Sequence, residues 1–90
     1  MDFLVFSYKY QKTIYISSFP NNTTNNYPHG ISNVSQIIDA KAIMFVNGGI
    51  RLFSGRNDTI EADKTNVTIV CNSNYSSYSG YATLQYIKTT

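Results

Sequence analysis

The sequence predicts an all-β fold, a small antiparallel β-sandwich of jelly-roll-like form. β-Branched and aromatic residues alternate with polar ones at period two, most regularly in residues 66–72 (NVTIVCN) and 80–90 (GYATLQYIKTT). That period suits a half-buried pleated strand and not a helix. Clusters of Asn, Gly, Pro and Ser recur between such segments, and 90 residues make one domain. We therefore expect about six or seven short strands in one compact domain, whose modest core would gain from association between subunits.

The first third of the chain is predicted to contain strands followed by a long loop. Residues 3–10 are a candidate strand, and residues 12–19 (KTIYISSF) are a stronger one because they hold more β-branched and aromatic residues. Residues 20–30 (PNNTTNNYPHG) concentrate turn-forming residues, so we expect a loop there that takes no part in a sheet. By this division residues 1–18 form an N-terminal strand segment with an anchoring or oligomerisation role, and residues 19–90 form the main β-domain.

Residues 31–46 fit two periodicities. The residues between positions 34 and 42 include a helical stripe that Ser32 would cap, whereas residues 40–46 alternate as a strand. We expect a short helical turn at residues 32–35, followed by a strand.

The remaining chain reads as short strands joined by turns. Residues 47–49 (NGG) supply the positive φ values of a tight turn, after which residues 50–53 return as a strand. Another turn is expected at residues 56–58 and a short strand at residues 60–63. Residues 65–90 are then predicted to form a terminal β-hairpin with the Tyr/Ser/Asn loop at its tip.

Charge and composition argue against several classes of function. Charged residues make up 13% of the chain, the net charge is +2, and the Lys and Arg residues are scattered, so no basic stripe and no nucleic-acid partner are expected. Asn, Ser and Thr together are roughly a third of the residues, a polarity without charge that suits extracellular or virion-exposed proteins. No apolar run approaches the ~20 residues of a membrane span, and Asp2 lies where a signal peptide carries positive charge. We expect neither membrane insertion nor a signal peptide.

Few side chains are candidates for catalysis or metal binding. Cys71 is the only cysteine and lies in phase with the apolar residues of its strand, so we interpret it as a small buried hydrophobe. His29 is the only histidine, for which a structural hydrogen bond is expected and not a metal. Asp58, Glu61 and Asp63 are expected to form a charged outer face. Because nothing supplies a nucleophile, a base and an oxyanion site together, we expect no enzymatic activity, cofactor or metal.

Tyrosines and asparagines gather in the polar loops. The candidate surface-binding residues are Tyr27, Asn72, Asn74, Tyr75 and Tyr78. Clustered loop tyrosines with amides are typical of a saccharide-stacking surface or a paratope; the alternative is that the rings cover the ends of the sheet. Tyr81 is the tyrosine for which a structural role is most expected, because it begins a strand.

Three segments of the chain together resemble a known family. The polar loop runs into residues 29–33 (HGISN), a later loop contains residues 79–81 (SGY), and the final strand closes with Tyr86, Lys88 and two threonines. In this order they resemble the C-terminal β-domains of tailed-bacteriophage fibre and receptor-binding proteins, over about residues 19–90.

The resemblance implies a homotrimeric, non-enzymatic β-domain on the virion surface, a fibre or a capsid or tail decoration subunit. Its partners would be other virion proteins and host cell-surface polysaccharide. Phe3, Phe6 and Tyr8 are candidate contacts between the copies, because aromatic residues offer large contact areas. Two other functions remain open: a monomeric carbohydrate-binding or adhesin module, and, less favoured, a single-strand nucleic-acid binder that stacks bases on tyrosines.

Overall fold

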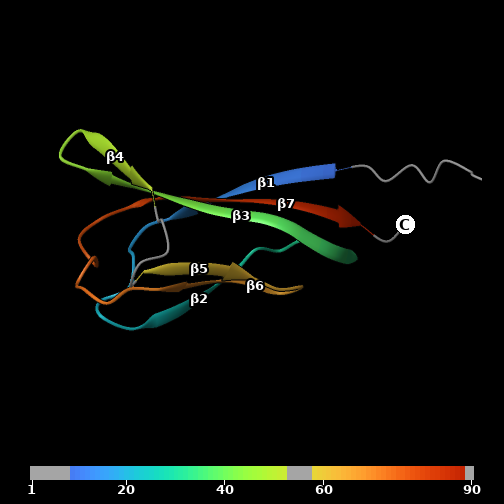
Figure 1. Cartoon of the computed structure of the whole chain (residues 1–90), viewed down its shortest axis with the longest axis horizontal. Helices are drawn as coiled ribbons and strands as arrows, with labels where there is room; N and C mark the ends of the chain where they lie inside the picture. The colour runs from blue at the N-terminus through green and yellow to red at the C-terminus, as the bar shows by residue number, and fades with distance from the viewer. Residues whose placement is uncertain (1–8, 53–57, 89–90) are drawn as a thin grey trace, which may run out of the picture.

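The computed structural model describes residues 9–52 and 58–88, and every regular element in these ranges is a β-strand (Figure 1). The strands are β1 (Lys9–Ile16), β2 (Thr24–Pro28), β3 (Val34–Val46), β4 (Gly49–Leu52), β5 (Thr59–Ala62), β6 (Asn66–Val70) and β7 (Gly80–Lys88). The prediction of an all-β fold is confirmed. Phe3, Phe6 and Tyr8, the predicted contacts between copies, lie outside the described residues.

The strands form two antiparallel sheets that lie as two layers in Figure 1. One has four strands in the order β1-β7-β3-β4, and the other has three in the order β2-β6-β5. The chain passes repeatedly between the layers: only β3–β4 and β5–β6 are consecutive strands paired with each other. This is a two-sheet, sandwich-like architecture.

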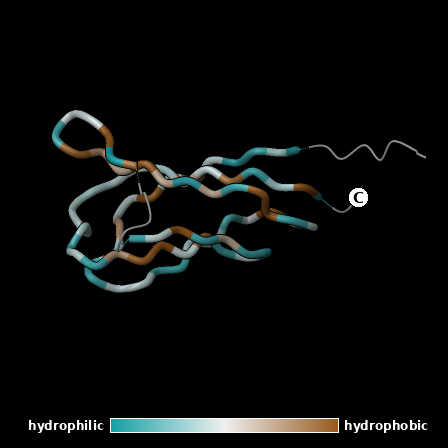
Figure 2. The backbone as a smooth tube through the Cα atoms, in the orientation of Figure 1, coloured by the Kyte–Doolittle hydropathy of each residue, from teal (hydrophilic) through white to brown (hydrophobic). Residues whose placement is uncertain are grey.

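The core lies between the two sheets. The four-stranded sheet contributes buried Ile16, Met44 and Leu84, and β6 of the opposite sheet contributes Val67 and Ile69. In both sheets these residues alternate with more exposed ones, which appears as alternating brown and pale or teal segments along the strands in Figure 2. Period two thus separates an inner face from an outer face, as expected for a pleated sheet.

The predicted terminal hairpin is wrong. β6 and β7 alternate as expected, but β6 pairs with β2 and β5, whereas β7 pairs with β1 and β3. Residues 71–79 therefore cross from one sheet to the other, and we call them the crossing loop. Nine residues are enough to span the ~10 Å between packed sheets, so the loop length does not require the two strands to pair.

The expectation that residues 20–30 stay outside a sheet is also wrong. β2 lies in this segment and pairs with β6 over five positions, from Thr24 opposite Val70 to Pro28 opposite Asn66. Backbone N–H and C=O groups supply the ladder bonds whatever the side chains are, and Pro28 is the last residue of an edge strand, where proline is tolerated.

The predicted helical turn at residues 32–35 is replaced by the start of β3, which extends over 13 residues. Asn33 bends the chain with a φ of 59°, and the pairing of β3 with β7 shifts register between Val34 and Gln36 and again between Ile37 and Asp39. Each shift moves the side-chain alternation by one residue. The apolar spacing therefore mimics a helical stripe within a strand.

Other element predictions hold within a few residues. Asn47 and Gly48 both have positive φ, 50° and 81°, as a tight two-residue hairpin turn requires, whereas Gly49, also expected in the turn, is already the first residue of β4. β4 and β5 match the predicted strands at 50–53 and 60–63 to within one residue. In place of separate strands at 3–10 and 12–19, β1 is one strand that runs without a break through residues 9–16; residues 3–8 lie outside the described residues. The predicted turn at 56–58 falls mostly outside the described residues.

Candidate functional site: the crossing loop and the apolar outer face

The crossing loop is bound along its length to the segment that leaves β1. Cys71 N–H donates to the carbonyl of Thr23 at 3.0 Å, and Tyr75 N–H donates to the carbonyl of Pro20 at 3.0 Å. In the opposite direction, Asn22 N–H donates to the carbonyl of Ser73 at 2.8 Å, and Phe19 N–H donates to that of Tyr78 at 3.1 Å. The loop is therefore fixed at both ends and in the middle.

Side chains inside the loop stabilise it further. Asn74 Oδ1 accepts hydrogen bonds from the Ser76 N–H at 3.0 Å and from the Ser76 hydroxyl at 2.7 Å, an Asx turn. Tyr78 N–H donates to the carbonyl of Tyr75 at 3.0 Å, and Asn72 N–H donates to Asp58 Oδ1 at 2.9 Å. The predicted binding residues of this loop are consequently held in one arrangement.

The structure brings Tyr75 and Tyr78 together. Their ring centroids lie 6.1 Å apart, and both rings are half-buried against the end of the core. The Tyr75 hydroxyl accepts a hydrogen bond from the Arg51 guanidinium at 3.4 Å. Asn72 and Asn74 are exposed beside them. The rings thus cover the end of the sandwich and still present part of their surface.

Tyr27 lies on β2 and reaches the crossing loop through one intermediate residue. Its hydroxyl donates to the carbonyl of Ser18 at 2.8 Å, while the Ser18 hydroxyl donates to the carbonyl of Ser76 at 2.7 Å. The Tyr27 ring is half-buried on the inner face of its sheet, opposite Val67, and burial raises the pKa of its hydroxyl. All five predicted binding residues therefore belong to one hydrogen-bonded region.

The four-stranded sheet carries a second candidate surface, which the sequence analysis did not predict. We call it the apolar outer face; its members are Tyr15, Ile43, Phe45, Ile50, Leu52 and Tyr81. Cross-strand register aligns Leu52, Ile43, Tyr81 and Tyr15 in one row over all four strands, and Phe45 faces Ile50 beside it. Tyr81 is the centre, with ring centroids 5.5 Å from Tyr15 and 5.7 Å from Phe45.

This face is exposed. The exposed fractions are 60% for Tyr15, 62% for Ile50 and 58% for Leu52, with 42% for Phe45 and 40% for Tyr81. Tyr81 is therefore not the covered structural residue that its position at the start of a strand suggested. The signal was available in the alternation, because residues adjacent to the buried Ile16, Met44 and Ala82 must point outward.

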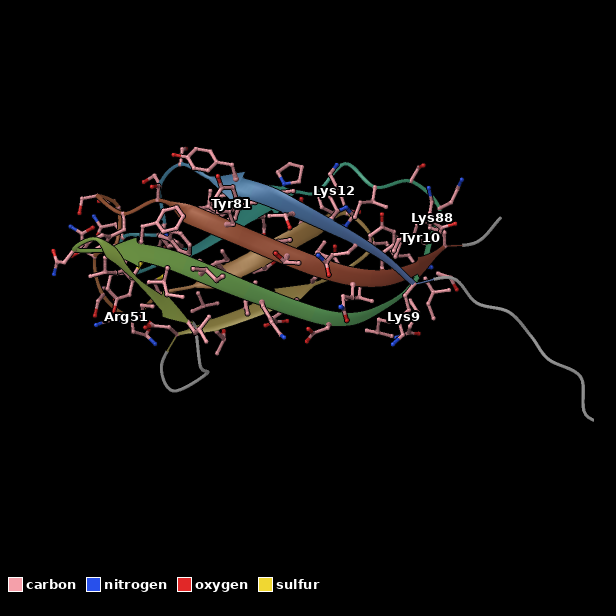
Figure 3. All side chains as sticks on the ribbon, turned by 90° about the horizontal axis from the view of Figure 1, so that it is seen from above. Lys9, Tyr10, Lys12, Arg51, Tyr81 and Lys88 are labelled. Carbon is pink, nitrogen blue, oxygen red and sulfur yellow. The ribbon has the colours of Figure 1, made fainter. Side chains whose placement is uncertain are left out.

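Five cationic residues of the described ranges are spread over the four-stranded sheet: Lys9, Lys12, Lys41, Arg51 and Lys88. Figure 3 shows Lys9, Tyr10 and Lys88 at one end of the four-stranded sheet and Arg51 at the other. Lys12 Nζ donates to the carbonyl of His29 at 2.7 Å, Lys41 Nζ lies 3.6 Å from Asp39 Oδ2, and Lys88 Nζ lies 5.8 Å from the Tyr10 ring centroid. This geometry distributes the charge instead of lining up a basic stripe.

His29 and Cys71, whose side chains are potentially reactive, both have structural roles. His29 is buried; its Nδ1 accepts the Ile31 N–H at 3.1 Å, so Nε2 carries the proton donated to the carbonyl of Asp63 at 2.8 Å. The expected structural hydrogen bond is confirmed. Cys71 is buried as expected, and burial, followed by the charge of Asp58, raises the pKa of its thiol to about 11. At neutral pH the thiol is therefore protonated and a poor nucleophile.

Within the described ranges, no group of three or more His, Cys, Asp or Glu side chains is arranged to hold a metal ion. Those ranges also contain no helix long and apolar enough to cross a membrane. Comparison with protein-family models, curated proteins and solved structures finds no match.

Proposed function

We propose that this chain is a non-enzymatic bacteriophage virion surface protein, a fibre or a capsid or tail decoration subunit, whose crossing loop binds host cell-surface polysaccharide. The observation that carries the binding role is the crossing loop itself, which holds Tyr75 and Tyr78 beside the exposed Asn72 and Asn74 in one hydrogen-bonded arrangement. The virion location rests on the resemblance of residues 19–90 to fibre β-domains.

The chemistry of this loop suits a sugar. Tyrosine rings offer apolar area to the C–H face of a pyranose, and the exposed Asn74 offers its Nδ2 donors to the sugar hydroxyls, since Asn74 Oδ1 already accepts two bonds from Ser76. A loop already fixed by hydrogen bonds loses little conformational entropy on binding, which is important for a ligand that forms weak individual contacts.

The proposed form is a homotrimer with jelly-roll-like connectivity. Two sheets joined by repeated crossings are compatible with this connectivity. A 90-residue domain also has a modest core, so burial between copies adds stability that the single chain lacks. A monomeric carbohydrate-binding module would use the same loop, and absolute mass by light scattering separates the two.

The test of the ligand is binding of the full chain, fluorescently labelled, to an array of bacterial surface polysaccharides. Tyr75→Ala combined with Tyr78→Ala is expected to reduce binding at least tenfold, because both rings of the site are removed. Tyr10→Ala is the matched control, since it removes an exposed tyrosine from the far end of the four-stranded sheet (Figure 3).

Circular dichroism decides whether the double variant still folds. Because the two rings also cover the core, Asn72→Ala supplies a second test at an exposed residue of the loop. Binding by the wild type that neither change weakens would remove the crossing loop from the proposal. Failure of the wild type to bind any polysaccharide would overturn the ligand class.

A further inference from the structure

The two outer faces of the sandwich differ in chemistry. On the three-stranded sheet the outward positions include Thr24, Asn26, Glu61 and Thr68, and the Thr68 hydroxyl donates to Asn26 Oδ1 at 2.7 Å. The corresponding positions at one end of the four-stranded sheet form the apolar outer face. The hydropathy view shows hydrophobic segments on both arms of the β3–β4 hairpin, which extends beyond the body of the sandwich (Figures 1 and 2). The three-stranded sheet has a polar outer surface, so the sandwich does not require apolar outer surfaces to fold. The apolar outer face of the other sheet is therefore not explained by the folding of a single chain.

We propose that copies of this chain associate with one another through the apolar outer face. The inference rests on the proposed function, for which it names the surface that joins the subunits. The six members are aromatic or aliphatic and none is charged, which matches the composition of the centre of a protein–protein interface.

The area is adequate for a stable contact. With roughly 200 Å² per side chain, the exposed fractions of Tyr15, Phe45, Ile50, Leu52 and Tyr81 amount to on the order of 500 Å². A standard interface buries about 800 Å² on each partner, and the next rows of the sheet supply polar area around the apolar centre. One of these rows contains Thr13 and Thr83, whose hydroxyls are hydrogen-bonded to each other at 3.0 Å.

The charge around the face favours a second copy over an anionic polymer. The charged residues nearest to the apolar row along β3 are Lys41 and Asp39, which lie 3.6 Å apart and neutralise each other. Two copies can therefore approach without bringing unpaired like charges together. Arg51 faces the other way: it stands opposite the buried Met44 and donates to Tyr75. Aliphatic Ile50 and Leu52 have no hydrogen bonds to offer a sugar or a base.

This mode of association agrees with the position of the crossing loop. The inner side of the four-stranded sheet packs on the three-stranded sheet, so a contact through its outer side leaves the three-stranded sheet facing solvent. The crossing loop joins the two layers at one end (Figure 1) and ends next to Tyr81, where the Ser79 carbonyl accepts the Phe45 N–H at 2.8 Å. Its Tyr75 and Tyr78 rings pack against the core and not on the outer side of the four-stranded sheet. Each copy in the assembly can then bind its own ligand, which increases avidity for a repeating surface polymer.

The experiment is sedimentation velocity of the full chain over a range of concentrations, comparing the wild type with Tyr15→Thr combined with Leu52→Thr. These positions are the two ends of the apolar row on the edge strands, and threonine keeps the β-propensity. We expect the variant to associate at least tenfold more weakly, with an unchanged circular dichroism spectrum. Tyr10→Thr is the control: it removes a tyrosine that is 41% exposed on β1 but faces the opposite side of the sheet, stacked on Tyr86, and should leave association unchanged.

A measurement on the wild type keeps the proposal testable if the double variant does not fold. Tyrosine nitration followed by mass spectrometry should show Tyr15 and Tyr81 protected at concentrations where the chain associates, while Tyr10 stays reactive. Association with Tyr15 and Tyr81 still reactive, or unchanged in a folded double variant, would overturn the assignment of this face and leave the polysaccharide proposal intact. A wild type that stays monomeric at high concentration would overturn both the face and the trimer.

Discussion

Gly80 lies so close to the backbone of Ile43 that a Cβ on Gly80 would overlap the carbonyl oxygen of Ile43. Gly80 is the first residue of β7, is buried, and faces Met44 in the register of β3. The glycine thus allows the crossing loop to enter the four-stranded sheet directly against β3, and it sets the position of Tyr81 next to it.

Gly80→Ala should destabilise the fold by about 1–3 kcal/mol or more, because the added methyl meets backbone and not a side chain that can move. Chemical denaturation measures the loss. Gly49→Ala is the matched control: its Cβ would lie 3.6 Å from the carbonyl oxygen of Val46, an ordinary contact, so little change is expected. Equal stability of the two variants would show that the close approach of β3 and β7 is not required.

His29→Ala should cost about 2–4 kcal/mol, because it leaves a cavity and removes the partners of two backbone groups. The imidazole ties the end of β2 to the turn between β5 and β6, through the carbonyl of Asp63 and the N–H of Ile31. Lys12→Met is the comparison, since it keeps the aliphatic stem but removes the bond to the His29 carbonyl. Guanidine unfolding should find it less destabilising than His29→Ala; the reverse order would mean that the lysine and not the imidazole holds this end.

Cys71 should be inert in the folded protein. Burial raises the pKa of its thiol from 9.0 to about 11, so alkylation at pH 8 is expected only after unfolding in guanidine. The sign for stability follows from linkage: the folded state favours the neutral thiol, so its contribution is complete below about pH 9 and is lost as the pH rises towards 11. Cys71→Ala should flatten this part of the profile of unfolding free energy against pH and should leave the proposed polysaccharide binding unchanged. Rapid alkylation of the native chain would contradict the burial.

Asp63 should account for part of the loss of folding stability at low pH. Its carboxylate accepts the N–H groups of Asn66 and Thr65 at 2.7 and 2.8 Å, which lowers its pKa below 3.8. The contribution is therefore present above about pH 4 and is lost as the pH falls through the lowered folded-state pKa. Asp63→Asn keeps an acceptor oxygen without the charge, so the melting temperature should depend less on pH in this range. Glu61→Gln is the control, a carboxylate exposed on β5; an equal effect of both changes would point to net charge and not to the turn.

Several features could be predicted because they depend on neighbouring residues only. Alternation at period two identified the strand character of β6 and β7, and it placed Cys71 inside. Asn47 and Gly48 formed the expected turn because few other residues adopt positive φ without strain. The loop position of Tyr75 and Tyr78 likewise followed from the polar residues around them.

The wrong predictions of strand pairing and of the helical turn have a common physical cause. Alternation tells which side of a strand is apolar, but it does not tell which strand lies beside it, since backbone ladder bonds are nearly independent of sequence. The polar segment of β2 therefore joins a sheet, and β6 and β7 belong to opposite sheets. The two register shifts in β3 disturbed the periodicity from which a helical turn was inferred.

The sequence by itself determined that this chain is built of half-buried strands, that its thiol and histidine are structural, and that its loops carry tyrosine and asparagine. Only the tertiary structure decided which of these residues share a surface. Tyr15, Ile43, Leu52 and Tyr81 are distant in sequence, and they form one apolar row because β1, β7, β3 and β4 pair in that order and register. Such a surface arises from long-range pairing, whose free energy depends on closing the two-layer core, and no local pattern along the chain contains that information.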